Sequence, residues 1–130
     1  MKRTSRIIIA TLLGILAFFT TIILIGLILT VACVFLAKIR IFEILLYSPI
    51  GSLILPHAVY VPAFFCAHYV IEKTGKNNYL PFLIVGIMIL TVYIPSGIIT
   101  LLANDTLWAD LYGIAGGIFF IRHAMELKKQ

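Results

Sequence analysis

The sequence predicts an all-α integral membrane protein: a four-helix transmembrane bundle with both termini cytoplasmic and a proline-broken second span. Of its 130 residues, 62% are hydrophobic and only 12% are charged, which is more apolar surface than a soluble domain of this length can bury. Charged residues separate four apolar segments, and none shows the alternating polarity of a membrane strand. We therefore expect residues 1–130 to form one transmembrane domain, with spans at about 7–37, 44–71, 79–103 and 107–121.

Basic residues set the expected orientation. With the N-terminus inside, the cytoplasmic side receives most of them: Lys2, Arg3, Arg6, Lys73, Lys76, Arg122, Lys128 and Lys129. This distribution satisfies the positive-inside rule. Orientation therefore explains the net charge of +5, and no nucleic-acid contact is expected from the spans. The outer surface is expected to carry four charged residues: Lys38, Arg40, Asp105 and Asp110.

The first apolar run, residues 7–37, is too long for the bilayer. At ~1.5 Å per residue it measures about 46 Å, against ~30 Å of hydrocarbon. It is also about twice the apolar core of a signal peptide, which has roughly 7–15 residues. We expect a retained helix that projects beyond the membrane on the outer side.

Prolines interrupt the next two spans. Pro49, Gly51 and Pro56 fall within residues 48–57, and each proline removes an amide donor and clashes with the preceding turn. We expect this segment to be irregular or kinked, either re-entrant or lying at the outer interface. Pro95 predicts a second break, in the outer half of the third span.

Small residues predict where helices approach closely. They recur at helical spacing along the first and fourth spans: Ala10, Gly14, Ala17, Ala109, Gly113 and Gly117. Such faces allow backbones to pack together in lipid, although the pattern does not say whether the partner helix belongs to the same chain. Because four short spans bury few side chains between them, we expect a homo-oligomer.

A polar face is predicted inside the membrane. His57, Tyr60 and His68 lie on one side of the second span, and Tyr93 and Ser96 of the third span can join them. Polar groups are costly in lipid, so this face should line the bundle interior or a cavity. It is either a pore or proton path, or a set of structural hydrogen bonds to neighbouring helices; the structural interpretation is favoured.

Metal and cofactor binding are not predicted. His68 and His123 fall at the same depth and could form one pair, but zinc requires about three or four ligands, and a pair of bis-histidine haems would need four histidines where the chain has three. Cys33 and Cys66 fall near opposite ends of their spans, so both are expected to be unpaired structural residues.

Catalysis is not predicted either. No predicted span has Asp, Glu, Lys or Arg in its interior, so the membrane-embedded carboxylate of a proton-coupled drug exporter is missing. A hydrolase built from Ser96, His57 and Asp105 is a remote possibility.

The leading hypothesis is a non-enzymatic protein of the bacterial inner membrane that acts by oligomerisation and by binding a protein partner. Immunity, exclusion, phage-defence and accessory membrane subunits act in this way. The expected working surfaces are residues 48–57, the outer charges and the basic loop 72–78 with the C-terminal tail. The alternative is a small oligomeric channel or transporter with a pore lined by His57, Tyr60 and His68 next to the Pro95 break. A haem or quinone anchor subunit is a more remote third possibility.

Overall fold

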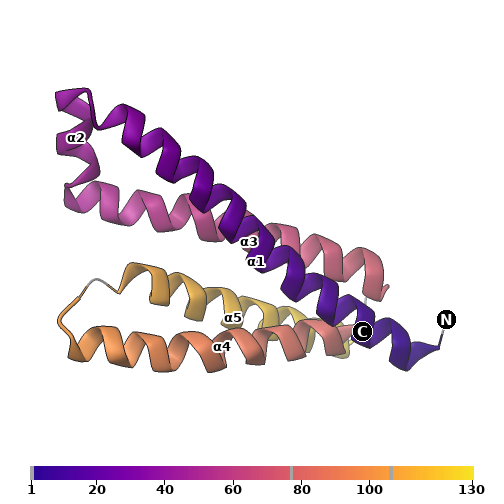
Figure 1. Ribbon diagram of the computed structural model, residues 1–130. Helices are drawn as coiled ribbons and strands as arrows, with labels where there is room; N and C mark the ends of the chain where they lie inside the picture. The colour runs from indigo at the N-terminus through magenta and orange to yellow at the C-terminus, as the bar shows by residue number, and fades with distance from the viewer. Residues whose placement is uncertain (1, 77, 106) are drawn as a thin grey trace.

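The computed structural model describes residues 2–76, 78–105 and 107–130; for five of these residues it describes the backbone alone: Leu46, Ile50, Ser52, Leu53 and Trp108. The described residues are helical, with short connections. The helices are α1 (Arg3–Leu36), α2 (Arg40–Leu46), α3 (Pro49–Gly75), α4 (Tyr79–Leu102) and α5 (Trp108–Lys128) (Figure 1). The predicted all-α class is confirmed.

Three helical segments are long and apolar enough to cross a membrane: Arg3–Leu36, Ile54–Gly75 and Tyr79–Leu102. Helix α5 is not among these three. Its 21 residues include four charged ones: Asp110, Arg122, Glu126 and Lys128. The structure therefore supports a membrane protein with three candidate membrane-spanning helices in the described part of the chain.

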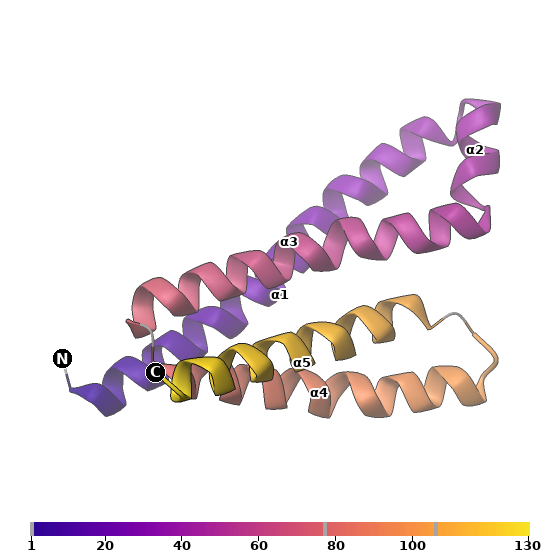
Figure 2. The ribbon, with the colours of Figure 1, turned by 180° about the vertical axis from the view of Figure 1, so that it is seen from behind.

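The long helices form two antiparallel hairpins. Helix α1 packs along α3, and α4 packs along α5; contacts of α3 with α5 and of α1 with α4 join the two hairpins. Figures 1 and 2 place both chain termini at one end of the molecule, here called the terminal end. Helix α2 and the α4–α5 connection lie at the opposite end, here called the α2 end.

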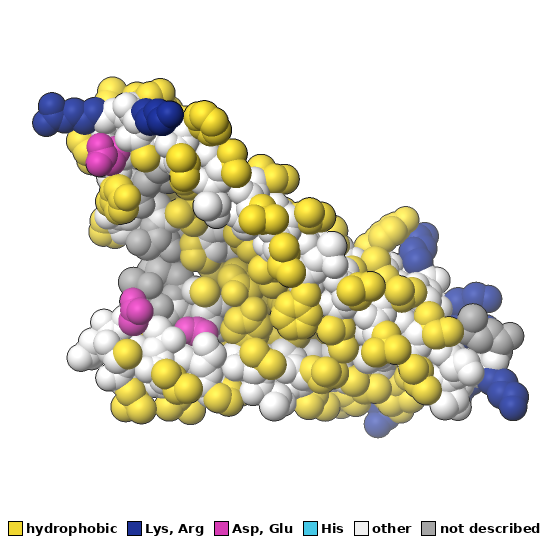
Figure 3. Space-filling model, viewed as in Figure 1, with side chains coloured by type: hydrophobic (Ala, Val, Ile, Leu, Met, Phe, Trp, Pro, Cys, Tyr) yellow, Lys and Arg dark blue, Asp and Glu magenta, His cyan; other side chains and the backbone are white. Residues whose placement is uncertain are grey.

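The core occupies the part of the bundle where the hairpins meet. Its buried members are apolar and come from all four long helices: Phe18, Ala63, Ala67, Ile71, Phe82, Val85, Ile89, Phe120 and Ala124. Large apolar side chains also cover the outside of the bundle, and Figure 3 shows them between basic side chains at both ends. This surface is the one expected of a protein whose solvent is lipid.

Helices α1 and α3 meet closely at the terminal end and separate towards the α2 end (Figure 2). A Cβ added to Gly14 would lie 2.5 Å from a carbon of Ile71, so no larger residue fits there without a shift. Twelve residues further along α1, a Cβ added to Gly26 would meet nothing within 4 Å. The helix pair is therefore packed at one end and open at the other.

The prolines do not break α3 or α4. The chain turns at Tyr47–Ser48, and one continuous helix then runs from Pro49 to Gly75 with Pro56 and Pro62 inside it. The prediction of an irregular segment at 48–57 is wrong. Pro49 occupies the first helical turn, where its fixed φ suits the helix and its missing N–H costs no intrahelical hydrogen bond. The side chain of Ser48 accepts a hydrogen bond from the Gly51 amide and caps this start.

Helix α4 is likewise continuous through Pro95, so the break predicted there is also wrong. Interior prolines are tolerated in membrane helices when neighbouring groups satisfy the carbonyl that loses its amide donor. The predicted second span, 44–71, is correspondingly shifted, since residues 44–46 belong to α2.

Candidate functional site

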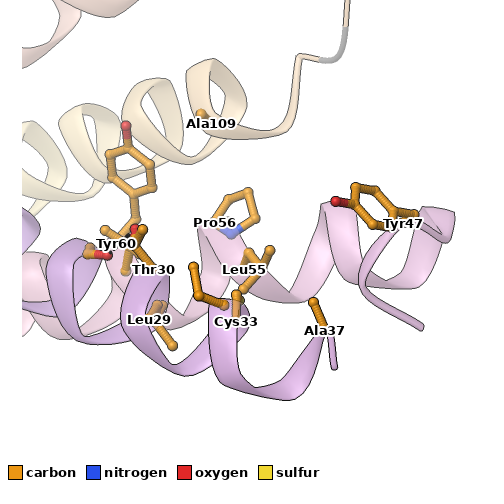
Figure 4. Close-up of a pocket in the computed structure, with 12 residues that line it drawn as sticks. Leu29, Thr30, Cys33, Ala37, Tyr47, Leu55, Pro56, Tyr60 and Ala109 are labelled. Atoms are coloured by element: carbon orange, nitrogen blue, oxygen red, sulfur yellow. Dashed lines mark hydrogen bonds between the residues drawn. The ribbon is translucent and has the colours of Figure 1, made fainter. Parts of the chain in front are cut away.

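A groove opens between α1 and α3 near the α2 end. Its volume is about 560 Å³. Residues from α1, α3 and α5 line it, together with two that flank α2: Gly26, Leu29, Thr30, Cys33, Val34, Ala37, Tyr47, Leu55, Pro56, Val59, Tyr60 and Ala109. In Figure 4, Tyr47 and Tyr60 mark its two ends, and Ala109 reaches it from α5. The lining is mostly apolar.

The wall that α1 contributes is made largely of small residues. Gly26, Thr30, Cys33 and Ala37 follow one another at three- and four-residue spacing, so they share one helix face. The Thr30 hydroxyl donates to the Gly26 carbonyl at 2.7 Å, which satisfies the hydroxyl within its own helix. Small side chains along this face leave the groove wide.

A cluster of tyrosines and a histidine lies beside the groove. The Tyr93 hydroxyl donates to the Tyr60 hydroxyl at 3.1 Å, and the Tyr112 hydroxyl lies 2.8 Å from His57 Nδ1. The Tyr60 and Tyr112 rings are parallel, with centroids 6.4 Å apart. These four side chains, the tyrosine cluster, connect α3, α4 and α5.

Asp110 is buried next to this cluster. Its side chain accepts a hydrogen bond from the Ser96 hydroxyl at 2.7 Å, and the residue is only 7% exposed. A Cβ added to Gly97 would lie 3.5 Å from the Asp110 Cβ, so α4 and α5 are close here. Gly97 lies five residues before the end of α4, which places the carboxylate about 8 Å inside that end.

Asp110 was expected on the outer charged surface, and that expectation is wrong. The residue falls in the first turn of α5, where the helix dipole favours an acid, but this turn packs against α4 instead of facing water. Lys38, Arg40 and Asp105, the other three members of that predicted surface, are exposed.

A layer of phenylalanine rings closes the bundle beneath the tyrosine cluster. The Phe64 ring lies 6.2 Å from Tyr60, 5.1 Å from Phe18 and 6.0 Å from Phe120, measured between centroids. Phe18 and Phe120 are buried, with 2% and 0% exposed. Polar groups at the α2 end are therefore separated from those nearer the terminal end.

His68 and His123 form the polar group on the other side of this layer. Their ring centroids are 4.6 Å apart, so the two residues are neighbours, as their shared depth predicted. His68 Nδ1 lies 3.7 Å from a carboxylate oxygen of Glu72, and the Phe82 ring contacts both imidazoles. Among the described residues, no group of three or more metal-binding side chains is close enough to hold a metal ion.

The predicted polar face is thus divided. His57, Tyr60 and Tyr93 belong to the tyrosine cluster, Ser96 pairs with Asp110, and His68 lies across the phenylalanine layer. The remote hydrolase triad is not assembled, because Ser96 bonds to Asp110 while His57 bonds to Tyr112.

The small residues predicted to pack helices contact helices of the same chain. A Cβ on Gly113 would meet the Tyr93 ring, and one on Gly117 would meet Leu90 and the Gly86 carbonyl oxygen, all on α4. On α1, Ala10 is fully buried and Gly14 faces Ile71. The remaining two positions, Ala17 and Ala109, are partly buried, and Ala109 lines the groove.

Sequence reasoning missed three features of this site. The small-residue wall Gly26–Ala37 shows the same spacing as the faces that were recognised, so it could have been found. Tyr112, a polar aromatic residue near the start of the predicted fourth span, could have been added to the polar face. The burial of Asp110 had no signal in the sequence, because Asn104 and Asp105 before it are typical of an exposed loop.

Comparison with known protein families, with curated proteins and with solved structures gives no match to this chain.

Proposed function

We propose that the protein is a small, non-enzymatic membrane protein of the transporter class that binds a hydrophobic small molecule in the α1–α3 groove. The observation that carries this proposal is the groove of about 560 Å³ that opens near the α2 end above the phenylalanine layer. A cavity reached from one end and closed at the other is the form a transporter has in one of its two states. The proposal includes non-enzymatic action, because Ser96 bonds to Asp110 and His57 to Tyr112, so the two do not form the pair that a hydrolase would need.

A continuous pore is a weaker interpretation of the same residues. A pore lined by His57, Tyr60 and His68 would have to cross the layer in which Phe64 contacts Phe18 and Phe120. Ions do not cross packed aromatic rings unless those rings move apart. A binding site that is accessible from one end needs no such opening.

We further propose that α5 is a fourth membrane crossing. It packs along α4 from Gly97–Asp110 at one end to Phe82–His123 at the other, so it should occupy the same depth as α4. Both termini then lie on one side, which is the cytoplasmic side by the distribution of Lys and Arg. The groove would open towards the outer face of a bacterial inner membrane.

Two native cysteines provide the test. Cys33 lines the groove, whereas Cys66 is exposed on α3 outside it. The full chain is reconstituted in vesicles as two single-cysteine variants, Cys66→Ala and Cys33→Ala, and labelling by a membrane-permeable maleimide is timed with increasing Nile red, a neutral hydrophobic dye. We expect the dye to slow labelling of Cys33 saturably and to leave Cys66 unchanged. Equal effects on both thiols would contradict the proposal.

Partner binding, the leading hypothesis from the sequence, is the second candidate. The observation that favours it is the small-residue wall of the groove, because such faces accept a second helix in lipid. Two observations from the sequence now support partner binding less. The small residues Gly113 and Gly117 pack on α4 of the same chain, and Asp110, expected on the outer charged surface, is buried in the bundle.

Oxidative cross-linking in native membranes tests this candidate. A helix of a second copy in the groove should bring Cys33 of two chains together and give a disulfide-linked dimer that Cys33→Ala abolishes. Cross-links made only through Cys66 would count against a helix in the groove.

A further inference from the structure

The buried carboxylate of Asp110 has no cationic partner in the described part of the chain. The ion pairs found there join His68 to Glu72 and Arg122 to Glu126. Asp110 accepts one hydrogen bond, from the neutral hydroxyl of Ser96. Little water reaches a carboxylate that is 7% exposed, so it attracts a nearby positive charge more strongly than it would in water.

Polar side chains connect this carboxylate to the groove. Tyr60 lines the groove and receives the hydrogen bond of Tyr93. The Tyr93 ring packs on Gly113, which lies about one helical turn after Asp110 on α5. Ser96 follows Tyr93 by three residues on α4, so the two lie on one face. Ala109, the residue before Asp110, is itself part of the groove lining.

The groove and the cluster together have the properties of a site for an apolar cation. The groove offers apolar walls, and the ring of Tyr60 at one end of it offers a π face that attracts a positive charge. A hard inorganic cation is a poor fit, because it requires about six oxygen ligands and the described residues gather no group of three metal-binding side chains.

We propose that the ligand of the groove is a lipophilic organic cation, with its apolar groups between α1 and α3 and its charge held by Asp110 and the tyrosine cluster. This inference rests on the proposed groove function and specifies its substrate class. The negative charge at Asp110 selects against anions of the same shape. A neutral hydrophobic molecule fills the groove without using the carboxylate.

The experiment compares two ions of nearly identical shape and opposite charge. The unmodified full chain in nanodiscs is titrated with tetraphenylphosphonium and, separately, with tetraphenylborate, and binding is followed by equilibrium dialysis against empty nanodiscs. The titration is repeated with Asp110→Asn and with Asp105→Asn, an exposed acid at the same end that serves as the matched control.

We expect saturable binding of the phosphonium and none of the borate. Asp110→Asn should weaken phosphonium binding by about thirtyfold or more, the order expected when one partner of a buried charge pair is removed, while Asp105→Asn leaves it unchanged. Equal binding of the two ions by the unmodified protein would overturn the inference, and this result does not depend on whether any variant folds.

The two proposals fail in different ways. If Nile red protects Cys33 but the phosphonium has no advantage over the borate, the groove function stands and the cation inference is wrong. If Nile red does not protect Cys33 and neither ion binds saturably, both are wrong.

Discussion

Gly113→Ala tests how the tyrosine cluster is held. Gly113 lies on α5 directly beneath the Tyr93 ring, and an added Cβ would come within 2.2–2.5 Å of Tyr93 Cγ and both Cδ atoms. These atoms are the base of the ring, and turning the ring about its Cβ–Cγ bond leaves Cγ where it is. Either Tyr93 changes rotamer or α4 and α5 move apart, and both disturb the hydrogen bond from Tyr93 to Tyr60.

The expected cost follows from three contributions. Overpacking destabilises the protein by about 1–3 kcal/mol, and loss of the hydrogen bond destabilises it by about 0.5–1.5 kcal/mol more. Replacing a helical glycine by alanine stabilises the helix by about 0.8–1.0 kcal/mol, which offsets part of this loss. The free energy of unfolding should therefore fall by roughly 1–3 kcal/mol, within the range of single core substitutions.

Gly26→Ala is the matched control. It makes the same chemical change on a helix, but its added Cβ meets nothing within 4 Å, so it should be neutral or slightly stabilising. The assay is equilibrium unfolding in mixed micelles of mild detergent and dodecyl sulfate, followed by circular dichroism. Equal stability of the Gly113→Ala and Gly26→Ala proteins would refute the packing of α4 on α5 described above.

Two further substitutions, an oxidation experiment and a mapping experiment extend this reasoning. Gly86→Ala should destabilise the protein by about 1–3 kcal/mol in the same unfolding assay, because its Cβ would lie 3.0 Å from the Gly117 carbonyl oxygen, which cannot rotate away; no loss would contradict that contact. Tyr93→Phe removes only the hydroxyl, so the loss should be about 0.5–1.5 kcal/mol with an unchanged helical spectrum. Oxidation should give no internal disulfide, because Cys33 and Cys66 differ in depth by about 20 Å along the α1–α3 pair; Cys66→Ala serves as the control for any mobility shift on a non-reducing gel. Reporter domains fused to either terminus should report the same side of the membrane, and opposite sides would exclude four crossings.

The sequence predicted the helices whose ends are marked by charge or by turn residues. Helix α4 begins at Tyr79, as expected, because Asn78 caps it by accepting a hydrogen bond from the Leu80 amide at 3.1 Å. The shared depth of His68 and His123 could also be worked out, since antiparallel helices with a constant rise per residue bring known positions to one level.

What the sequence did not predict depends on contacts between segments far apart in the chain. Proline at position 49 reads as a helix breaker, yet it starts a helix because the turn falls just before it. Asp110 follows a polar connection and reads as an exposed residue, and only the packing of α5 on Gly97 buries it. Local pattern fixes where helices form, whereas the side chains they enclose depend on how the hairpins pack.

Helix α2 has a mechanical consequence for the groove. It joins the separated ends of α1 and α3 (Figure 1), and its seven residues form a strut about 10 Å long at ~1.5 Å per residue. A strut of fixed length limits how far the two walls can part while it stays helical. If the groove binds a small molecule as proposed, a ligand wider than this span would require α2 to unwind, and the short helix would then limit the size of the molecules that enter.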